Sequence, residues 1–501
     1  MGTKKVTLTL EPAGTCCEVA VGTPLRDVLF QFGVEMPCGG KGRCGGCKVR
    51  MLAGDLPAES GTAYRLPADA IKNGWRLACK HEVSGPLTLE IAQWDSLILA
   101  DHSTFSFVPQ DGRGIAVDIG TTTMAAQLLD LQSGHVLKVR TARNPQGQFG
   151  ADLMSRISFA LEDGQQVQLR HLLRDAVGAL VGALVDADQA ARLRQITVVG
   201  NSPMHHFFSG LDVQPFAALP FDSPHHDACT LNAAALGWDL PQELPITVLP
   251  NIGGFVGSDV LAGIVASNMA HQEKLTVLID LGTNGEMVVG NQDGMICAST
   301  AAGPAFEAAK ISCGMQASTG AISEVKVVDG KVQCTVIGGG KPRGICGSGL
   351  VDAIAAGLEL GAITASGRFQ TGVQELQLAD GIALNQADIR ELQLAKGAVA
   401  AGVRILLKHL GRREDEVEQV LIAGAFGNYV RLASASRIGL LRFPQEITES
   451  IGNSALLGAK MALFMDDVQH QEVGALARSI RHLCLSSDPD FMDIYADEMF
   501  F

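Results

Sequence analysis

The 501-residue sequence has few aromatic residues, no excess of positive charge and no long hydrophobic run. Phe, Trp and Tyr together make up 5% of the residues, and the formal net charge is −14. Nucleic acids and anionic membranes bind clusters of Lys and Arg, so we expect neither as the main partner. A nucleotide is not excluded, because helix N-termini and one local Lys are enough to bind phosphate.

The sequence also has no apolar run of about 18 residues and no apolar signal-peptide core. We therefore expect no membrane-spanning helix and a cytoplasmic location. Disulfides rarely persist in the cytoplasm. The 12 cysteines are accordingly expected to be reduced thiols and metal ligands, not a disulfide framework.

Glycine and aliphatic residues are abundant, with 57 Gly and 47% hydrophobic residues, which is typical of α/β enzymes. Residues 4–10 and 18–21 alternate like a hairpin, and residues 23–33 follow with a helical pattern that Thr23 would cap. The pattern of expected strands and helices then changes along the chain. We expect a β-rich domain over 1–93, a linker over 94–113, and a domain over 114–501 in which strands alternate with long helices.

Four cysteines in the first domain are spaced like metal ligands. Cys38, Cys44 and Cys47 lie in one glycine-rich loop, and Cys79 lies in a distant segment. A ferredoxin-type [2Fe–2S] cluster takes three thiolates from one wrapping loop and a fourth from elsewhere. Zinc ribbons normally have two Cys-x2-Cys pairs and this region has one, so zinc is the weaker alternative and plain thiols are a third. The spacing resembles that of adrenodoxin-like ferredoxins, and the preceding hairpin and helix resemble a β-grasp fold.

A strand-and-turn pattern is repeated in the larger domain. GIAVDIGTTT (114–123) and TVLIDLGTNGE (276–286) each place an aspartate, Asp118 or Asp280, between an apolar strand and a Gly/Thr turn; QVLIAGAFGNYV (419–430) is a third strand and turn. Such turns offer backbone N–H groups and hydroxyls to phosphate, and the carboxylate can hold Mg²⁺ through water. The repeat predicts two related halves around a cleft.

This pairing resembles the ASKHA ATPase superfamily of sugar and acetate kinases, heat-shock chaperones and actin, which has two ribonuclease H-like halves; here they would cover about 114–274 and 275–501. Further phrases narrow the resemblance: NPQGQFGADLMSRI (144–157), VVGNSPMHHFFSG (198–210), LPNIGGFVGSDVLAG (249–263), AAGPAFEAAKISCGM (301–315) and GICGSGLVDAIA (344–355). Together with the cysteine motif, they make the chain similar over nearly its whole length to the ATP-dependent reductive activators of corrinoid proteins.

The resemblance implies an enzyme that hydrolyses ATP and transfers an electron from its [2Fe–2S] cluster to a corrinoid protein of a methyltransferase system. The electron would return inactive Co(II) to Co(I), and a low-potential donor would reload the cluster. The oligomeric state stays open, with a homodimer as one option. Three other functions also stay open: a metabolite kinase fused to a ferredoxin, an activator of 2-hydroxyacyl-CoA dehydratases, and a nucleotide-gated chaperone for corrinoid-protein assembly.

The resemblance also implies roles for individual residues. Cys38, Cys44, Cys47 and Cys79 would bind the cluster. The first phosphate loop would be Asp118, Gly120, Thr121 and Thr122, and the second Asp280, Gly282, Thr283 and Asn284. The adenosine pocket would be lined by Gly424, Ala425, Phe426 and Gly427, with Gly347, Ser348 and Gly349 nearby at a helix N-terminus. Glu286 or Asp259 would orient the attacking water, with a capping or supporting role as the alternative for each.

Four further expectations concern features outside these loops. His205 and His206 are expected on a strand, as polar or cleft residues, and Arg156 as a salt-bridged helix residue. The segment after residue 484 is expected to dock on the protein. Members of the resembled family can carry an extra middle domain, whereas about twenty residues separate the two domains here, so we expect that domain to be absent.

Overall fold

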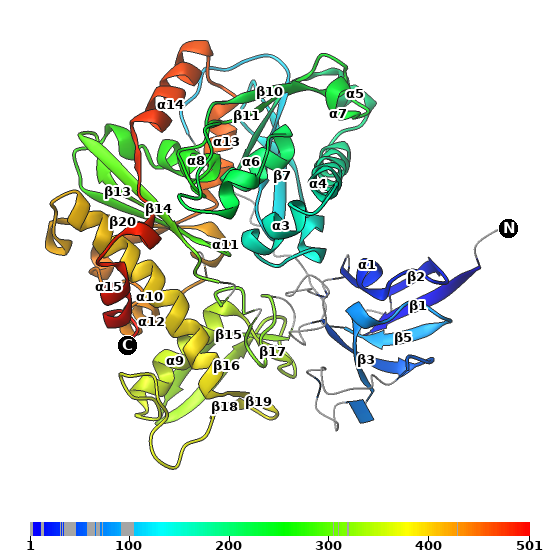
Figure 1. The fold of residues 1–501 in the computed structure, drawn as a ribbon, viewed down its shortest axis with the longest axis vertical. Coiled ribbons are helices and arrows are strands. Elements are labelled where there is room, and N and C mark those ends of the chain that lie inside the picture. The colour runs from blue at the N-terminus through cyan, green and yellow to red at the C-terminus, as the bar shows by residue number, and fades with distance from the viewer. Residues whose placement is uncertain are drawn as a thin grey trace.

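The computed structural model describes residues 4–11, 15–30, 32, 34, 47–57, 66, 71, 72, 74–91, 105–303, 305–308, 310–317, 320–427 and 429–501. These residues form a small N-terminal part and two larger lobes, each built on its own sheet (Figure 1). The predicted fold class, a ferredoxin-like domain followed by an α/β ASKHA domain, is confirmed. No helix among the described residues is long and apolar enough to cross a membrane.

The N-terminal part is a five-stranded sheet with one helix against it. The strand order is β2-β1-β5-β3-β4, with β1 and β2 forming the predicted hairpin and β1 parallel to β5. Its elements are β1 (Lys5–Glu11), β2 (Thr15–Ala20), α1 (Leu25–Phe30), β3 (Lys48–Ala53), β4 (Trp75–Leu77), the 3₁₀ helix η1 (Ala78–Lys80) and β5 (Leu87–Glu90). Leu8, Leu25, Leu29 and Val49 are fully buried between sheet and helix.

The beginning of α1 differs from the prediction. Pro24 forms a β-bridge with Glu82, which places Pro24 in extended backbone and starts the helix at Leu25. The Thr23 hydroxyl donates to the Ala20 carbonyl, 2.8 Å away, and so closes the preceding turn instead of capping the helix.

The first lobe has a six-stranded sheet in the order β10-β11-β9-β6-β7-β8. Its elements are β6 (Arg113–Ile119), β7 (Thr123–Asp130), β8 (Val136–Arg143), η2 (Pro145–Gln148), α3 (Leu153–Ala160), α4 (Gln165–Gly182), α5 (Ala187–Ala191), β9 (Leu193–Gly200), α6 (Ser202–Ser209), η3 (Gln214–Ala217), β10 (Cys229–Asn232), α7 (Ala233–Leu236), β11 (Pro245–Val248), α8 (Ser258–Ser267) and η4 (Met269–His271). Helices α3, α4 and α6 cover one face of this sheet.

The second lobe has a six-stranded sheet in the order β21-β20-β12-β13-β14-β22. Its elements are β12 (Thr276–Leu281), β13 (Gly285–Asn291), β14 (Gly294–Thr300), β15 (Ala321–Val328), β16 (Lys331–Val336), β17 (Gly344–Ile345), α9 (Gly347–Glu359), β18 (Leu376–Ala379), β19 (Ile382–Leu384), α10 (Gln386–His409), η5 (Glu414–Glu416), β20 (Gln419–Ala423), α11 (Gly424–Gly427), α12 (Leu432–Arg437), η6 (Gln445–Ile447), β21 (Thr448–Gly452), α13 (Ser454–Ala462), α14 (Asp467–Ser479), β22 (Arg481–His482), η7 (Leu485–Ser487) and α15 (Phe491–Asp497).

The two sheets share one topology. The first runs β8-β7-β6-β9-β11 and the second β14-β13-β12-β20-β21, with three antiparallel strands followed by two parallel ones. Asp118 on β6 and Asp280 on β12 therefore occupy equivalent places, next to the last residues of their central strands. The repeat seen in the sequence corresponds to a structural repeat.

Two helices cross between the lobes. Helix α8 follows the first sheet in the chain but packs Val260, Leu261 and Ile264 on the second sheet. Helix α13 follows the second sheet but packs Leu456 and Ala459 on the first. Each sheet thus obtains part of its cover from the other half of the chain.

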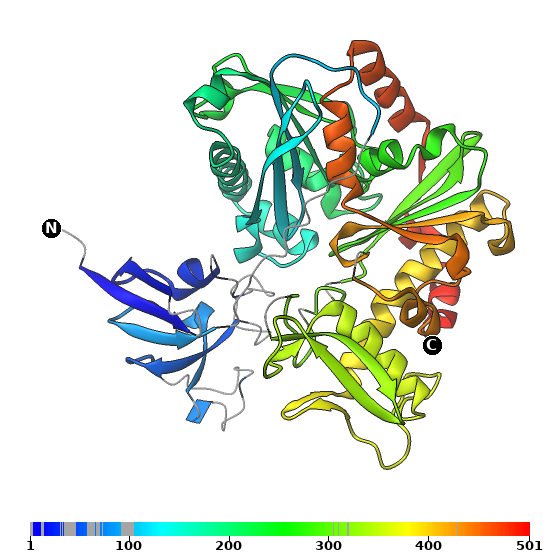
Figure 2. The ribbon, with the colours of Figure 1, turned by 180° about the vertical axis from the view of Figure 1, so that it is seen from behind.

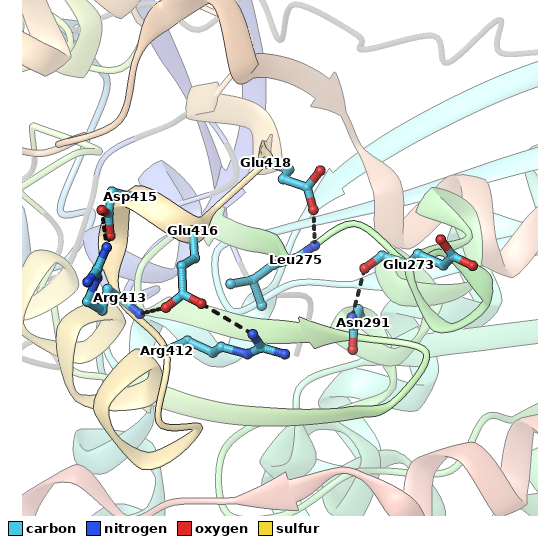
Figure 3. Close-up of polar contacts among 8 residues, drawn as sticks. All are labelled: Glu273, Leu275, Asn291, Arg412, Arg413, Asp415, Glu416 and Glu418. Carbon is cyan, nitrogen blue, oxygen red and sulfur yellow. Dashed lines mark hydrogen bonds and ion pairs between the residues drawn. The ribbon is translucent and has the colours of Figure 1, made fainter.

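Polar contacts join strand ends at one edge of the second lobe (Figure 3). The Glu418 carboxylate accepts a hydrogen bond from the backbone N–H of Leu275 at 3.3 Å, just before β12 begins. Asn291 at the end of β13 donates to the Glu273 carbonyl at 2.8 Å. Nearby, Glu416 accepts from Arg412 and from the backbone of Arg413. The first contact joins the beginnings of β12 and β20, and the second joins the end of β13 to the segment before β12.

The segment after residue 484 docks on α10, as predicted. Helix α15 packs along α10, and Glu498 forms ion pairs with Arg404 and Arg442. Lys396 on α10 is buried and donates to the Phe500 carbonyl at 2.5 Å.

Candidate functional site

A cavity of about 380 Å³ lies between the two lobes and is lined by both sheets. The residues predicted for phosphate binding that line it are Asp118, Gly120, Thr121, Thr122, Asp280, Gly282, Thr283 and Asn284. The structure therefore brings together two turns that lie about 160 residues apart in the chain. Their equivalent positions on two sheets of equal topology place them on opposite sides of one space.

The first turn is held by buried amides. The backbone N–H of Gly120 donates to the Thr123 carbonyl at 3.1 Å, which closes the turn. Asn144 donates to the Gly120 carbonyl and Asn201 to the Thr121 hydroxyl, each at 3.0 Å. Buried polar groups with satisfied hydrogen bonds are rigid, so these two asparagines fix the shape of the turn.

The second turn is closed in the same way, and one glycine is required beside it. The N–H of Gly282 donates to the Asn284 carbonyl at 3.0 Å. Gly424 begins α11 with φ of +88°, and a Cβ there would lie 2.5 Å from Oδ1 of Asp280. Any other residue at 424 would be strained and would displace this carboxylate.

Five carboxylates line the cavity: Asp118, Asp259, Asp280, Glu286 and Glu307. Asp280 and Glu286 are directly opposite each other on β12 and β13, and Asp259 lies in the first turn of α8. Burial raises the pKa of Asp118 to about 6 and that of Asp280 to about 7. Burial also raises the pKa values of Asp259 and Glu286, and repulsion between the acids adds to the effect.

This concentration of negative charge fits a cation. Asn453 donates to Asp118 at 3.0 Å, which favours its ionised form. Among the described residues, no group of three acids, histidines or cysteines is placed to chelate one metal ion. A pair of carboxylates such as Asp118 and Asp280 fits the ligand set of Mg²⁺, which takes one or two carboxylates and keeps several waters.

The residues predicted for the adenosine pocket are placed unevenly. Gly347, Ser348 and Gly424 line the cavity together with Cys346, which precedes α9. Gly349 and Gly427 are outside the lining: a Cβ at Gly349 would lie 2.2 Å from the Ile322 carbonyl oxygen, so this glycine serves the packing of α9 on β15. The side chains of Ala425 and Phe426 lie outside the described part of the structure.

Glu307 joins the two turns, and no sequence pattern pointed to it. Its carboxylate accepts from the Thr283 hydroxyl at 2.6 Å and from the Thr122 hydroxyl at 3.2 Å. The two hydroxyls are themselves 3.0 Å apart. Burial raises the pKa of Glu307, while these hydroxyls, Arg143 and Arg156 act in the opposite direction. In the sequence, Glu307 is a single glutamate in a segment of mostly small residues, AAGPAFEAAKIS.

Two of the four predicted cluster cysteines can be placed. The Sγ atoms of Cys47 and Cys79 are 3.3 Å apart, and the Ala78 N–H donates to the Cys47 carbonyl at 2.9 Å, which holds the two segments together. Two thiolates on one tetrahedral metal with bonds of about 2.3 Å are separated by about 3.8 Å, so this pair fits shared ligation after a small adjustment. Cys38 and Cys44 lie outside the described residues.

The histidine pair and Arg156 differ from the predictions. His205 and His206 lie on helix α6, not on a strand, and both are buried away from the cavity lining. His206 contacts the Ser202 carbonyl and the Ser223 hydroxyl. Arg156 is buried on α3 and donates to the Gly150 carbonyl at 2.8 Å, and the expected ion pair is not found among the residues that the structure describes.

Family models match three consecutive regions of the chain. A 2Fe-2S iron-sulfur cluster binding domain matches residues 8–84, the RACo middle region matches 113–272, and the C-terminal ASKHA domain of RACo matches 274–501. The expectation that a middle domain is absent was therefore wrong. The region that carries this description in the family is the one that forms the first sheet here.

Whole-chain comparisons agree with these matches. The chain is 33% identical over 440 residues to the corrinoid activation enzyme RamQ of Eubacterium limosum, covering 80% of this chain and 73% of that one. It is 28% identical to the [Co(II) methylated amine-specific corrinoid protein] reductase of Methanosarcina barkeri, covering 77% and 76%. A solved structure titled reductive activator for corrinoid, iron-sulfur protein matches with a TM-score of 0.70 and 27% identity, over 99% of this chain and 98% of that one. The chain belongs to the RACo family of corrinoid-protein activators.

Proposed function

We propose that this chain is an ATP-dependent reductive activator that passes one electron from its [2Fe–2S] cluster to a partner corrinoid protein and returns inactive Co(II) to Co(I). One observation carries the proposal: a cluster-binding domain and a two-lobed cavity with paired phosphate turns are joined in one chain. That chain is 33% identical to a corrinoid activation enzyme. The restored Co(I) would then accept a methyl group in a methyltransferase system.

The cluster supplies one-electron chemistry when it is bound. Cys47 and Cys79 would hold it from β3 and η1, and Cys38 and Cys44 would complete the four thiolates. The contact between Cys47 and Cys79 supports this assignment. A low-potential donor such as a reduced ferredoxin or flavodoxin would supply the electron, and we place the reaction in the cytoplasm, where thiols stay reduced.

The cavity would bind ATP with its phosphates between the two turns. Thr122 and Thr283 line this space with the other residues of both turns, and their hydroxyls suit phosphate oxygens. Mg²⁺ would lie beside Asp118 and Asp280, which the excess of buried carboxylates supports. Asp259 or Glu286 would orient the attacking water, and burial, which raises the pKa of both carboxyl groups, makes each a better proton acceptor once it is ionised.

ATP is needed because reduction of Co(II) is uphill for ordinary cellular donors. A nucleotide can change that reaction only if it binds two conformations of the activator with different affinity. The two lobes share crossing helices and would enclose the nucleotide. Closure of the lobes would move both sheets relative to the N-terminal part, so the open and closed states are two such conformations. Phosphoryl transfer to a metabolite would use the same cavity but gives no use for a cluster.

An anaerobic assay tests the function. The purified chain, reconstituted with iron and sulfide, is mixed with a titanium(III) reductant, Mg·ATP and candidate corrinoid proteins, while the Co(II) and Co(I) absorption bands are followed. We expect Co(I) to form only with ATP present. Cys79→Ser should abolish it while ATP still binds, whereas Cys16→Ser, an exposed cysteine of the same domain, serves as the matched control.

Two results would overturn the proposal. One is phosphorylation of a small metabolite with no reduction of any corrinoid protein, which would indicate a kinase. The other is normal activation of the corrinoid protein by the Cys79→Ser variant, which would indicate a nucleotide-gated chaperone that needs no cluster.

A further inference from the structure

The N-terminal part lies against both lobes (Figure 2). On the first lobe, the ring of Phe30 at the end of α1 packs on Gly147 of η2, so closely that a Cβ at Gly147 would lie 2.8 Å from Phe30 Cζ. On the second lobe, Arg343 donates to the Ile91 carbonyl at 2.9 Å. Any movement of one lobe against the other must therefore change at least one of these contacts.

Arg143 lies between the cavity and the first of these contacts. It is the last residue of β8 and lines the cavity. Its guanidinium carbon lies 5.8 Å from the centre of the Phe30 ring, a cation–π distance. Glu307 lines the same cavity, and the positive charge of Arg143 acts to lower the pKa of its carboxylate. One positive charge is thus shared between an anion of the cavity and an aromatic ring of the cluster-binding domain.

Glu307 occupies the position that suits a phosphate. It accepts hydrogen bonds from Thr122 and Thr283, the hydroxyls that the two turns would offer to a nucleotide. A triphosphate that enters the cavity competes with Glu307 for these hydroxyls. It also brings several negative charges toward Arg143, which then has a stronger electrostatic partner than the ring of Phe30.

We propose that Arg143 couples nucleotide binding to the docking of the N-terminal part. In the nucleotide-free state, Glu307 and the Phe30 ring hold its guanidinium at the interface, and the N-terminal part stays docked on η2. A bound triphosphate draws the guanidinium toward the cavity, weakens its contact with Phe30 and releases the N-terminal part toward its redox partners. This proposal rests on ATP binding in the proposed function and adds the interface through which ATP acts.

Arg156 is the fixed support of this interface. It is buried beneath η2, with Nη2 3.6 Å from the place of a Cβ at Gly147, and the Gly150 carbonyl holds its Nε. Arg143, in contrast, is only half-buried, at the end of a strand where it lines the cavity. The mobile charge in the proposal is therefore Arg143.

Coupling between two sites is reciprocal, which makes the proposal testable without any corrinoid protein. If ATP loosens the docked N-terminal part, then loosening that part must tighten ATP. Phe30→Leu removes the aromatic ring but keeps an apolar side chain in the core. Gly147→Ala inserts a methyl group from the other side; its backbone is outside the positive-φ region, so the strain arises at the interface.

The measurement is titration calorimetry of the reconstituted full chain with Mg²⁺ and a non-hydrolysable ATP analogue. We expect both variants to bind it about 2- to 5-fold more tightly than the wild type, the range of one partly exposed cation–π contact. Val19→Ala is the matched control, because Val19 and Phe30 are both 8% exposed in the same core and Val19 lies on β2, at the opposite edge of the sheet from β4. Its affinity should stay at the wild-type value.

Unchanged or weaker affinity in both interface variants, with normal iron content and unfolding temperature, overturns the coupling. The result of this test can be told apart from the result of the test of the proposed function. Tighter binding in the variants with no reduction of corrinoid proteins would keep the coupling and reject the reductase, whereas ATP-dependent reduction with unchanged affinities would do the reverse. A wild-type chain that does not bind the analogue overturns both.

Discussion

At the scale of single residues, the carboxylates of the cavity serve nucleotide binding but lower the stability of the nucleotide-free fold. Buried carboxylates with raised pKa values cost folding free energy when they ionise, and five of them line one space. The gain appears only when a cation and a polyphosphate are bound. Substitutions at these positions should therefore separate stability from nucleotide binding.

Asp280→Asn tests this separation. The pKa of Asp280 is raised to about 7 in the folded state, so its destabilising effect grows as pH rises from about 4 and is complete above about 7. We expect the variant to unfold at a higher temperature than the wild type without nucleotide, with a larger difference at pH 8 than at pH 5.5. Its affinity for Mg·ATP should fall about 10- to 100-fold, the value of a charged hydrogen bond. Differential scanning calorimetry and nucleotide titration measure the two effects.

The control for this prediction is Asp293→Asn, in the exposed turn between β13 and β14. It should change neither quantity. A loss of stability in Asp280→Asn at pH 8 would mean that the ionised carboxylate stabilises the nucleotide-free fold.

Glu307→Gln should tighten ATP binding, because it removes an anion that competes with phosphate and keeps a side chain of the same shape. We expect about a 2- to 10-fold lower dissociation constant, the range of a single hydrogen bond in water. Glu359→Gln, at the exposed end of α9, is the matched control. Weaker ATP binding in Glu307→Gln would show that the carboxylate acts with the nucleotide, for example through its cation.

The buried histidines predict acid sensitivity of the first lobe. Burial lowers the pKa of His205 to about 3 and that of His206 to about 4. Both must stay neutral in the fold, so their contribution to stability is present above pH 6.5 and is lost as the pH falls toward 4. His205→Leu should reduce the drop in unfolding temperature between pH 7 and pH 5, whereas exposed His135→Leu should leave it unchanged. An equal drop in both variants would place the acid sensitivity elsewhere.

At the scale of elements, the sequence predicted the features that depend on consecutive residues. Asp118 and Asp280 stand out because an apolar strand, an aspartate and a Gly/Thr turn follow one another along the chain. Glu307 does not, because its partners, Thr122 and Thr283, come from two sheets and become its neighbours only after both lobes assemble. The strand expected at His205 fails for a related reason: Asn201 caps a helix there, accepting from the Met204 N–H, and the cap outweighs the apolar run before it.

The crossing of α8 and α13 was also beyond local patterns, because each helix covers a sheet from the other half of the chain. Their contact is unusually close: a Cβ at Gly458 of α13 would lie 2.1 Å from the Ala262 carbonyl oxygen of α8. A Cβ at position 458 would meet the backbone of α8, and that backbone can move away only if the helix shifts. This pair is one structural link between the lobes.

Gly458→Ala should therefore lower the unfolding temperature by several degrees, since overpacking costs about 1–3 kcal/mol, and should weaken ATP binding by spreading the lobes. Gly182→Ala, at the end of α4, is the matched control. A Cβ there meets nothing within 4 Å, so it should stabilise slightly, by up to about 0.5 kcal/mol. Wild-type stability in Gly458→Ala would mean that the two helices can separate without cost.

At the scale of the whole molecule, the N-terminal part is joined to each lobe by separate contacts. Arg343→Ala removes the hydrogen bond to Ile91 on the second lobe. We expect a larger radius of gyration in small-angle scattering than for the wild type, and a further increase when it is combined with Phe30→Leu. Arg194→Ala, which breaks an exposed ion pair with Asp111, should leave the scattering curve unchanged. A compact Arg343→Ala variant would show that the first lobe alone holds the N-terminal part.

The exchange of helices between the two halves predicts how a truncated form of this protein behaves. A truncated version that stops near residue 272 would keep the first sheet but lose α13, and with it Leu456 and Ala459. Ala116, Val199 and Leu249, now fully or almost fully enclosed, would be left bare to solvent along one side. Such a fragment is expected to aggregate on expression, and co-production with the remaining residues should rescue it.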